Sequence, residues 1–327
     1  MLRTLSVVIT EETDPRWNLA MEEVLLRTVQ PGQCILYLWQ NQRTVVIGRN
    51  QHAANECRIQ TLEADGGHLV RRLSGGGAVY HDLGNLNFTF LTHWKDYDVE
   101  KQTEVILRAV QALGMRGEKN GRNDLTLDGG KFSGHAYYRA GDQCYHHGTL
   151  MVEVDLTPLE RYLNVSPLKL QAKGVQSVRS RVVNLRDYRP DLTISMLKQA
   201  LTEAFSQVYG LPVTQLGRGE VDQEMLYTCH ARFANPVWTY GEEMPLDHSR
   251  EARFDWGTLR LDYTCRDGVI QELALWSDGL EGDYLSRVPT LLRGCPREAG
   301  AIRARLGAEP GNTEEMTQGI LSLLMEE

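Results

Sequence analysis

Residues 71–81 read Arg-Arg-Leu-Ser-Gly-Gly-Gly-Ala-Val-Tyr-His, between a strand-like stretch at 67–70 and a strand that begins near Asn85. Three consecutive glycines give up side-chain contacts so that backbone N–H groups can approach a ligand closely, and two arginines add positive charge. This composition suits a cradle for a phosphate or a carboxylate. A glycine-rich turn between strands explains the glycines equally well, and the arginine pair favours the cradle. It is neither a Walker loop nor a dinucleotide fingerprint.

The stretches around this segment combine helical and strand periodicities. Apolar residues recur at helical spacing along residues 17–28, 99–113 and 197–208, which predicts three amphipathic helices. Strands are predicted where apolar residues alternate or form short runs, at residues 1–10, 34–39, 44–47, 86–91 and 149–154. Asn87 and Thr89 lie on the polar face of one such strand, where functional groups are expected. The pattern predicts a mixed α/β (α+β) fold.

The chain changes pattern near residue 245. Two prolines and a Gly-Glu-Glu run interrupt residues 235–245. The segment that follows has three strand-like stretches and then three helical ones, at 251–256, 259–264, 269–276, 282–292, 298–306 and 313–325. We therefore expect a large domain at 1–244 and a small α+β domain at 245–327.

Length, composition and charge restrict the class of protein. The chain has 327 residues, of which 42% are hydrophobic, so it can bury a substantial core and is not disordered. Its net charge of −8 argues against a protein that grips nucleic acid. No apolar run approaches the ~20 residues of a membrane-spanning helix. The six cysteines are scattered without a C-x-x-C pair, so neither zinc nor disulfides are predicted, and we expect a cytoplasmic protein.

Two further segments carry charged groups beside glycines. Lys131 follows Gly129 and Gly130, and its ammonium group can reach a cleft as a compact charge, while Asp124 offers a carboxylate for magnesium. The alternative is a hairpin turn at Asp128-Gly-Gly with an exposed lysine beside it. Residues 172–182 form a basic stretch that is either an exposed loop or a cover for an anionic ligand.

His146 and His147 precede Gly148 in a predicted strand. Neighbouring residues of a strand point to opposite faces, so this pair is a poor chelator of one metal ion. We interpret both histidines as structural and Gly148 as a position of close backbone approach.

Taken in order, these motifs resemble the lipoate-protein ligase A family. They are R-R-x-S-G-G-G-A-V-x-H-D-L-G-N at 71–85, R-N-D-L at 122–125, G-K-x-S-G-x-A at 130–136, H-H-G-T-L at 146–150 and A-K-G-x-x-S-V-R-S-R-V at 172–182. The resemblance extends from about Trp17 to Leu185, and the C-terminal part has the length and pattern of the family's accessory domain.

The resemblance implies a large domain similar to the catalytic fold of biotin ligases and lipoyl transferases, with a mixed sheet flanked by helices. It implies an enzyme that joins lipoate to AMP with ATP and Mg²⁺ and releases pyrophosphate. The lipoyl group then passes to a lysine of a lipoyl domain, in 2-oxoacid dehydrogenase acyltransferase subunits or the glycine-cleavage H protein. No nucleic acid, membrane or oligomeric partner is expected.

The resemblance also assigns roles to residues. Arg72 and Lys131 are the expected catalytic cations. The residues expected to contact ATP are Arg72, Gly77, Ala78, Val79, Tyr80 and Lys131, and those expected around lipoate are Ser74, Gly75, Gly76, His81, Lys131 and Gly148. Asn123 and Asp124 are the magnesium candidates, and Lys173, Arg179 and Arg181 are expected to cover the adenylate.

Three alternatives to the ligase require sequence features that differ from those present. An octanoyl or lipoyl transferase of the same fold needs a catalytic cysteine, and Cys144, the nearest thiol to the motifs, fits neither known position. A biotin ligase would carry G-R-G-R-x-G-R in place of the glycine segment. A non-catalytic binding protein would not need Lys131 with Arg72 and Asp124. The preference between lipoate and octanoate stays open, and His135 stands where the family often has a small residue.

Overall fold

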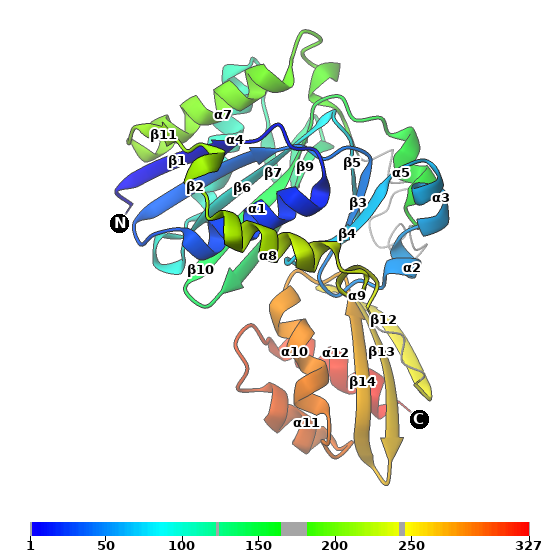
Figure 1. Ribbon diagram of the computed structural model, residues 1–327. Coiled ribbons are helices and arrows are strands. Elements are labelled where there is room, and N and C mark those ends of the chain that lie inside the picture. Colours follow the sequence, from blue (N-terminus) through cyan, green and yellow to red (C-terminus); the bar gives the residue numbers. More distant parts are fainter. Residues whose placement is uncertain (1, 122–123, 165–181, 242–245, 327) are drawn as a thin grey trace.

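The computed structural model describes residues 2–121, 124–164, 182–241 and 246–326. Figure 1 shows a large upper part built on one extended sheet and a smaller lower part that contains the C-terminus. Among the described residues, no helix combines the length and apolar character that crossing a bilayer demands.

An eight-stranded mixed sheet forms the centre of the large part. Its strand order is β11-β1-β2-β6-β10-β9-β8-β7, in which β1 pairs in parallel with β2 and β11 and the other pairings are antiparallel. The strands are β1 (Thr4–Ile9), β2 (Gln33–Trp39), β6 (Asn85–His93), β7 (Glu118–Asn120), β8 (Asp124–Leu127), β9 (Gly130–Ala140), β10 (Gln143–Met151) and β11 (Val213–Gln215).

Helices cover both faces of this sheet because the central strands bury apolar residues on both sides. Helices α4 (Val99–Ala112) and α7 (Ile194–Tyr209) pack on the face that presents Phe88 and Phe90. Helices α1 (Pro15–Thr28) and α8 (Gln223–Ala234) pack together on the opposite face, where Tyr37 and Leu91 are buried. The helices expected at 17–28, 99–113 and 197–208 are confirmed.

A second, three-stranded sheet lies beside the large one. Its order is β4-β3-β5, and β3 pairs in parallel with β4 and antiparallel with β5. The strands and the short helices around them are β3 (Thr44–Ile47), β4 (His68–Arg71), β5 (Val79–His81), α2 (Ala53–Glu56), α3 (Ile59–Ala64), α5 (Thr157–Tyr162) and α9 (Pro236–Tyr240). The glycine segment is the loop that joins β4 to β5.

The C-terminal part has its own sheet and its own apolar core. The antiparallel sheet β12-β13-β14 is covered by three helices, whose buried residues include Leu285, Ile302 and Ile320. These elements are β12 (His248–Phe254), β13 (Gly257–Arg266), β14 (Val269–Ser277), α10 (Gly282–Leu292), α11 (Ala299–Leu306) and α12 (Glu314–Met325). The three strands and three helices predicted from the sequence are present.

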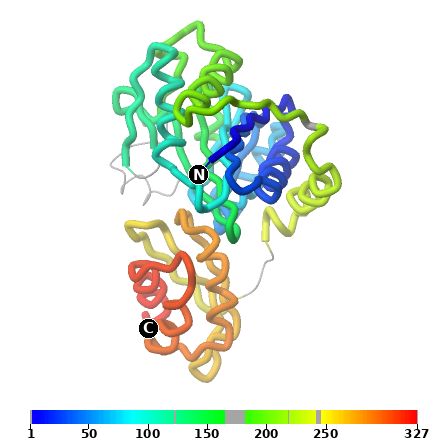
Figure 2. The backbone as a smooth tube through the Cα atoms, turned by 90° about the vertical axis from the view of Figure 1, so that its left-hand side faces the viewer, coloured from blue at the N-terminus to red at the C-terminus, as the bar shows by residue number. Residues whose placement is uncertain are grey.

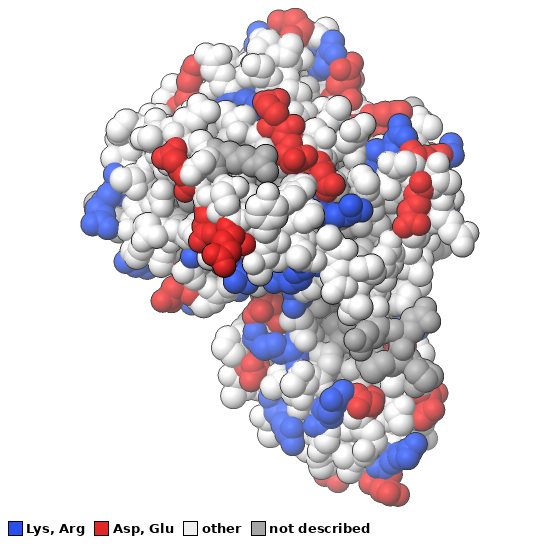
Figure 3. Space-filling view, viewed as in Figure 1, with Lys and Arg blue, Asp and Glu red and all other residues white. Residues whose placement is uncertain are grey.

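The C-terminal part contacts the large part through backbone hydrogen bonds. Figure 2 shows it suspended below the large part as a separate unit. The Ser277 amide donates to the Asn50 carbonyl at 2.7 Å, and the Gly76 amide donates to the Gly279 carbonyl at 2.9 Å. In Figure 3, basic side chains gather on this face where the two parts meet.

Candidate functional site

A cavity of about 420 Å³ opens between the two sheets of the large part and the C-terminal part. Ten of the residues predicted from the sequence line it, namely Arg72, Gly76, Gly77, Ala78, Val79, Tyr80, His81, Asp124, Lys131 and Gly148. They come from the glycine loop, β5, β8, β9 and β10, and the fold brings together residues as far apart in the chain as Arg72 and Gly148, which are 76 positions apart. Arg72 and Lys131 therefore face one common space.

Other predicted residues lie elsewhere. Ser74 is completely buried behind the cavity wall, and Gly75 is also absent from the lining. Asn123 and the predicted covering residues Lys173, Arg179 and Arg181 lie outside the described part of the chain. The roles assigned to all these residues stay predictions.

The two neighbouring arginines of the glycine segment have separate surroundings. The Arg71 guanidinium donates to backbone carbonyls, including those of Gln51 at 2.6 Å and Thr239 at 2.7 Å, and this arginine is not part of the cavity lining. Arg71 thus ties β4 to the segment around α9. Of the pair, Arg72 is the one that reaches the cavity.

Arg72 shapes the glycine loop from inside. Its Nη2 donates to the carbonyls of Gly75 at 2.7 Å and Gly77 at 2.9 Å, and its Nη1 donates to that of Val46 at 3.1 Å. Burial lowers the pKa of this guanidinium to about 10, so Arg72 remains a cation at neutral pH. The loop is wrapped around a buried positive charge, which suits an anionic ligand.

Lys131 lies across the cavity in a short hairpin. Asp128 and Gly129 both have positive φ, 47° and 83°, as a two-residue turn with the twist of a hairpin requires. The predicted turn is therefore present, and Lys131 is nevertheless a cavity residue. Its Nζ lies 2.7 Å from Oδ1 of Asp124 on the paired strand β8. The cation and its carboxylate partner thus reach the cavity together.

His146 and His147 point to opposite faces of β10, as predicted. His146 contacts Gln102 of α4 at 3.1 Å and His135 at 2.9 Å. His147 faces α1 and the glycine loop and contacts Glu22 and Ser74, both at 2.8 Å. Each histidine belongs to a buried polar network.

The cavity wall also holds two buried histidines that stay neutral. Burial, together with the positive charge of Arg72, lowers the pKa of His81 to about 3. Burial, together with Lys131, lowers the pKa of His135 to about 3. His135, the departure noted in the sequence, lines the cavity and contacts Ser133 Oγ at 3.0 Å.

We expect the free energy of unfolding to fall as the pH is lowered from 7 to 5. Histidine in the unfolded chain has a pKa of about 6.5, so it binds a proton below this pH. In the folded protein, His81 and His135 stay unprotonated until the pH falls to about 3. Their contribution is complete above the unfolded pKa and is lost as the pH falls toward the folded one. At pH 5 the loss is on the order of 1–2 kcal/mol for each histidine.

Urea unfolding at both pH values measures this loss. The variant His135→Gln removes one of the two titrating groups and should show a smaller difference between pH 7 and pH 5 than the unaltered protein. An equal difference in the two proteins would contradict a neutral His135.

The cavity contains further residues that were not predicted as site residues. The polar face expected on the 86–91 strand does face the cavity, through Asn85 and Asn87 of β6. The C-terminal part contributes Arg253, Asp255, Trp256, Gly257, Asp278 and Leu280. No local signal marks these last residues, because their position depends on how the two parts pack.

The chain matches two family models. One is described as the lipoyl protein ligase A/B catalytic domain and covers residues 14–206, and the other, the bacterial lipoate protein ligase C-terminus, covers residues 243–320. Lipoate-protein ligase A of Psychrobacter cryohalolentis is 37% identical over 92% of this chain and 91% of its own length. That of Bdellovibrio bacteriovorus is 34% identical over 98% and 96%.

Solved structures share the architecture. The P. falciparum protein LipL1 in complex with lipoate superposes with a TM-score of 0.87 at 24% identity, over 99% of this chain and 100% of that one. A lipoate-protein ligase A bound with ATP has a TM-score of 0.63 at 26% identity, over 74% and 99%. With the glycine loop, the lysine hairpin and the C-terminal part arranged as described, the chain belongs to the lipoate-protein ligase A family.

Proposed function

We propose that this protein is an ATP-dependent lipoate-protein ligase that makes lipoyl-AMP, releases pyrophosphate and transfers the lipoyl group to a protein lysine. The observation that carries the proposal is that Arg72 and Lys131, which are 59 positions apart, line one cavity beside the glycine loop. Two relatives are named lipoate-protein ligase A, and their similarity to this chain extends over nearly their whole length. Residues 1–244 bind and activate the acyl group, and residues 245–327 form the accessory part.

Charge neutralisation is the main chemical task of such a site. A carboxylate that attacks the α-phosphate of ATP brings two anions together, so positioning and electrostatics supply most of the catalysis. Lys131 is the mobile cation in this proposal, because its ammonium can leave Asp124 for the reacting oxygens. Arg72 supplies a fixed charge beneath the loop whose residues 77–80 receive the nucleotide.

In this proposal the acyl chain lies in the cavity against the wall formed by Gly76, His81 and Gly148. A Cβ at Gly148 would lie 2.5 Å from the Gly134 carbonyl oxygen and 2.7 Å from Phe88 Cζ, so this backbone packs where no side chain fits. Because Gly148 has no side chain, nothing projects from this part of the wall into the cavity.

Magnesium fits the residues present. Mg²⁺ is commonly held by one or two carboxylates together with substrate phosphates, and Asp124 is a cavity carboxylate next to Lys131. Bound there, the ion would neutralise charge on the ATP phosphates. Among the described residues, no group of three or more histidine, cysteine or acidic side chains is placed to hold a metal ion.

A thiol-dependent acyl transferase is disfavoured by the positions of the cysteines. All six are free, and none of them lines the cavity. Burial raises the pKa of Cys57 and of Cys144 to about 12, whereas a reactive thiol needs a lowered pKa. Free thiols are also in keeping with a cytoplasmic location, which we propose for this protein.

The acceptors in this proposal are lipoyl domains of 2-oxoacid dehydrogenase acyltransferase subunits and the glycine-cleavage H protein. An archaeal relative of known structure, 28% identical over 74% of this chain, is described as a bipartite ligase with its E2 lipoyl domain. The lysine amine attacks the mixed anhydride and AMP leaves, so no covalent enzyme intermediate is required.

The test combines purified protein, lipoate, ATP, Mg²⁺ and an apo lipoyl domain. We expect pyrophosphate release that depends on lipoate and a mass increase of the lipoyl domain that depends on ATP. If the lipoyl domain were modified without ATP, with octanoyl carrier protein as the acyl donor, the protein would be a transferase and the ligase assignment would be wrong. Lipoate binding without any pyrophosphate would leave only a binding protein.

A further inference from the structure

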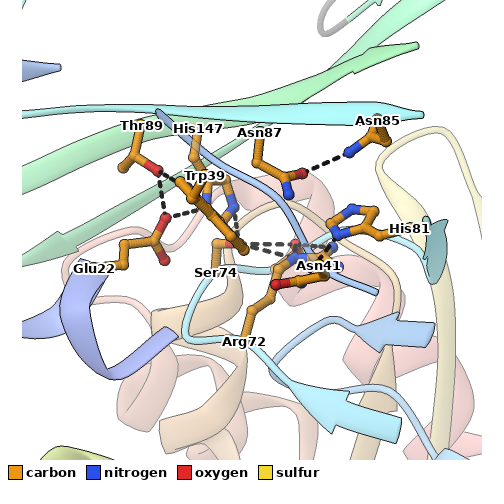
Figure 4. A network of polar contacts seen from close by, with 11 residues as sticks. Glu22, Trp39, Asn41, Arg72, Ser74, His81, Asn85, Asn87, Thr89 and His147 are labelled. Carbon is orange, nitrogen blue, oxygen red and sulfur yellow. Dashed lines mark hydrogen bonds and ion pairs between the residues drawn. The ribbon is translucent and has the colours of Figure 1, made fainter. Parts of the chain in front are cut away.

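A buried chain of hydrogen bonds joins Glu22 of α1 to Arg72 through His147 and Ser74 (Figure 4). Glu22 Oε1 lies 2.8 Å from His147 Nδ1, and His147 Nε2 lies 2.8 Å from Ser74 Oγ. Ser74 Oγ accepts from Arg72 Nε at 3.0 Å. All four side chains are buried, with Glu22 only 1% exposed.

The partners at the two ends set the direction of donation along this chain. A carboxylate only accepts and a guanidinium only donates. In its neutral form His147 therefore donates from Nδ1 to Glu22, and its Nε2 accepts from the Ser74 hydroxyl. Ser74 in turn accepts from Arg72, so each middle member donates one hydrogen bond and accepts one. In this orientation each of the four side chains has a hydrogen-bond partner.

The order acid–histidine–serine is that of a hydrolase triad, but Ser74 is not placed to attack a substrate. It is 0% exposed and does not line the cavity. Its oxygen already accepts from Arg72 Nε and lies 2.8 Å from His147 Nε2. A nucleophile needs an approach path for the substrate, whereas this serine is enclosed. The group that the chain fixes is the guanidinium.

A second branch of hydrogen bonds joins Glu22 to another residue of the cavity lining. Thr89 Oγ1 donates to Glu22 Oε1 at 2.7 Å, and the indole Nε1 of Trp39 donates to Thr89 Oγ1 at 3.1 Å. Trp39 lines the cavity. Glu22 thus accepts the branch that comes from Trp39 through Thr89 and the branch that leads through His147 and Ser74 to Arg72.

We propose that Glu22, His147 and Ser74 are positioning residues for acyl adenylation. They hold Arg72 in one rotamer, and through its Nη2 contacts with the Gly75 and Gly77 carbonyls they hold the glycine loop in its ligand-ready shape. A charge that is fixed before the reaction needs no reorganisation in the transition state. This inference rests on the proposed ligase function and adds a role that no motif position supplies for Glu22.

The test uses Glu22→Gln, which keeps the shape of the side chain. The amide can donate to His147 Nδ1, which favours the other tautomer and turns Nε2 from acceptor into donor, as in a triad whose aspartate becomes asparagine. Ser74 then loses its acceptor. We expect kcat for lipoate-dependent pyrophosphate release to fall about tenfold, while KM for lipoate changes by less than about threefold. Transfer from preformed lipoyl adenylate to a lipoyl domain should change less than adenylation.

A double-mutant cycle with Ser74→Ala separates positioning from general destabilisation. If Glu22 acts on Arg72 through Ser74, Glu22→Gln and Glu22→Gln/Ser74→Ala should each lose about as much as Ser74→Ala alone. Two losses that multiply to about a hundredfold would overturn the proposal. So would a lipoyl adduct on Ser74 in the intact mass of enzyme mixed with lipoyl adenylate.

Thr92→Val is the matched control. Thr92 lies on the same strand as Thr89, is equally buried, and donates to the Gln33 carbonyl at 2.9 Å, away from the cavity. Its adenylation rate should stay within about twofold of the unaltered protein. If Glu22→Gln does not fold, Thr89→Val removes one of the hydrogen bonds to Glu22 and should lower kcat in the same selective way. If the unaltered protein releases no pyrophosphate, the proposed function fails, which is a distinct outcome.

Discussion

Replacing Lys131 by alanine is expected to lower the rate of lipoyl adenylate formation by about 10²- to 10³-fold, the loss typical of removing one preorganised electrostatic contact. The Lys131 ammonium reaches the same cavity as Arg72 and lies 2.7 Å from Asp124. Without it, the developing negative charge on the phosphoryl oxygens has no adjustable counter-charge. Lipoate-dependent pyrophosphate release at saturating ATP measures the effect.

Lys119→Ala is the control for this variant. Lys119 lies on β7, the strand beside β8, and pairs with Glu100 outside the cavity. Removing an exposed ion pair costs little stability, about 0–1 kcal/mol, and should leave adenylation unchanged. Full turnover by Lys131→Ala would contradict the assignment of this lysine, and an equal loss in both variants would trace the effect to general charge.

Gly75→Ala is expected to weaken the packing of the C-terminal part against the large part. A Cβ at this position would lie 2.3 Å from the Gly279 carbonyl oxygen and 2.7 Å from that of Leu280, both in the C-terminal part. These are rigid backbone atoms, so the methyl group either strains the contact by about 1–3 kcal/mol or pushes the two parts to separate. Small-angle scattering should show a larger radius of gyration, and thermal unfolding should begin at a lower temperature than in the unaltered protein.

Gly77→Ala is the matched variant for structure and stability. It lies two residues along the same loop, and a Cβ there would have no atom within 4 Å. Neither glycine has a positive φ, so the comparison isolates the contact between the two parts from backbone strain. The dimensions and unfolding temperature of Gly77→Ala should match the unaltered protein. If both variants behave alike, the Gly75–Gly279 contact does not hold the parts together.

The structure gives the glycine segment a more specific role than its composition suggests. Gly75 packs against the C-terminal part, Gly76 contacts that part and also lines the cavity, and Gly77 and the residues after it line the cavity. The three glycines therefore serve two purposes, the packing of one part on the other and the close approach of a ligand. Sequence composition does not separate these purposes, because both require the absence of a side chain.

Periodicity predicted the elements well where packing follows a simple stripe. The β3 strand and α10 coincide with the predicted 44–47 and 282–292. Helices α8 and α9 were not predicted, although Asp222 and Asn235 cap their N-termini through side-chain hydrogen bonds. Asn-Pro before a short apolar stretch is a helix-start signal that the proline count at 235–245 obscured.

By itself, the sequence predicted the fold class, most helices and strands, and a candidate site at the glycine segment and Lys131. These features depend on residues close together in the chain, whose alternation or helical spacing records which face is buried. Only the tertiary structure decided that Arg72 reaches the cavity while Arg71 does not, and that Glu22 meets His147 across 125 positions. Such partners are selected by how helices pack on the sheet and by the need to satisfy each buried polar group, and neither is written in local spacing.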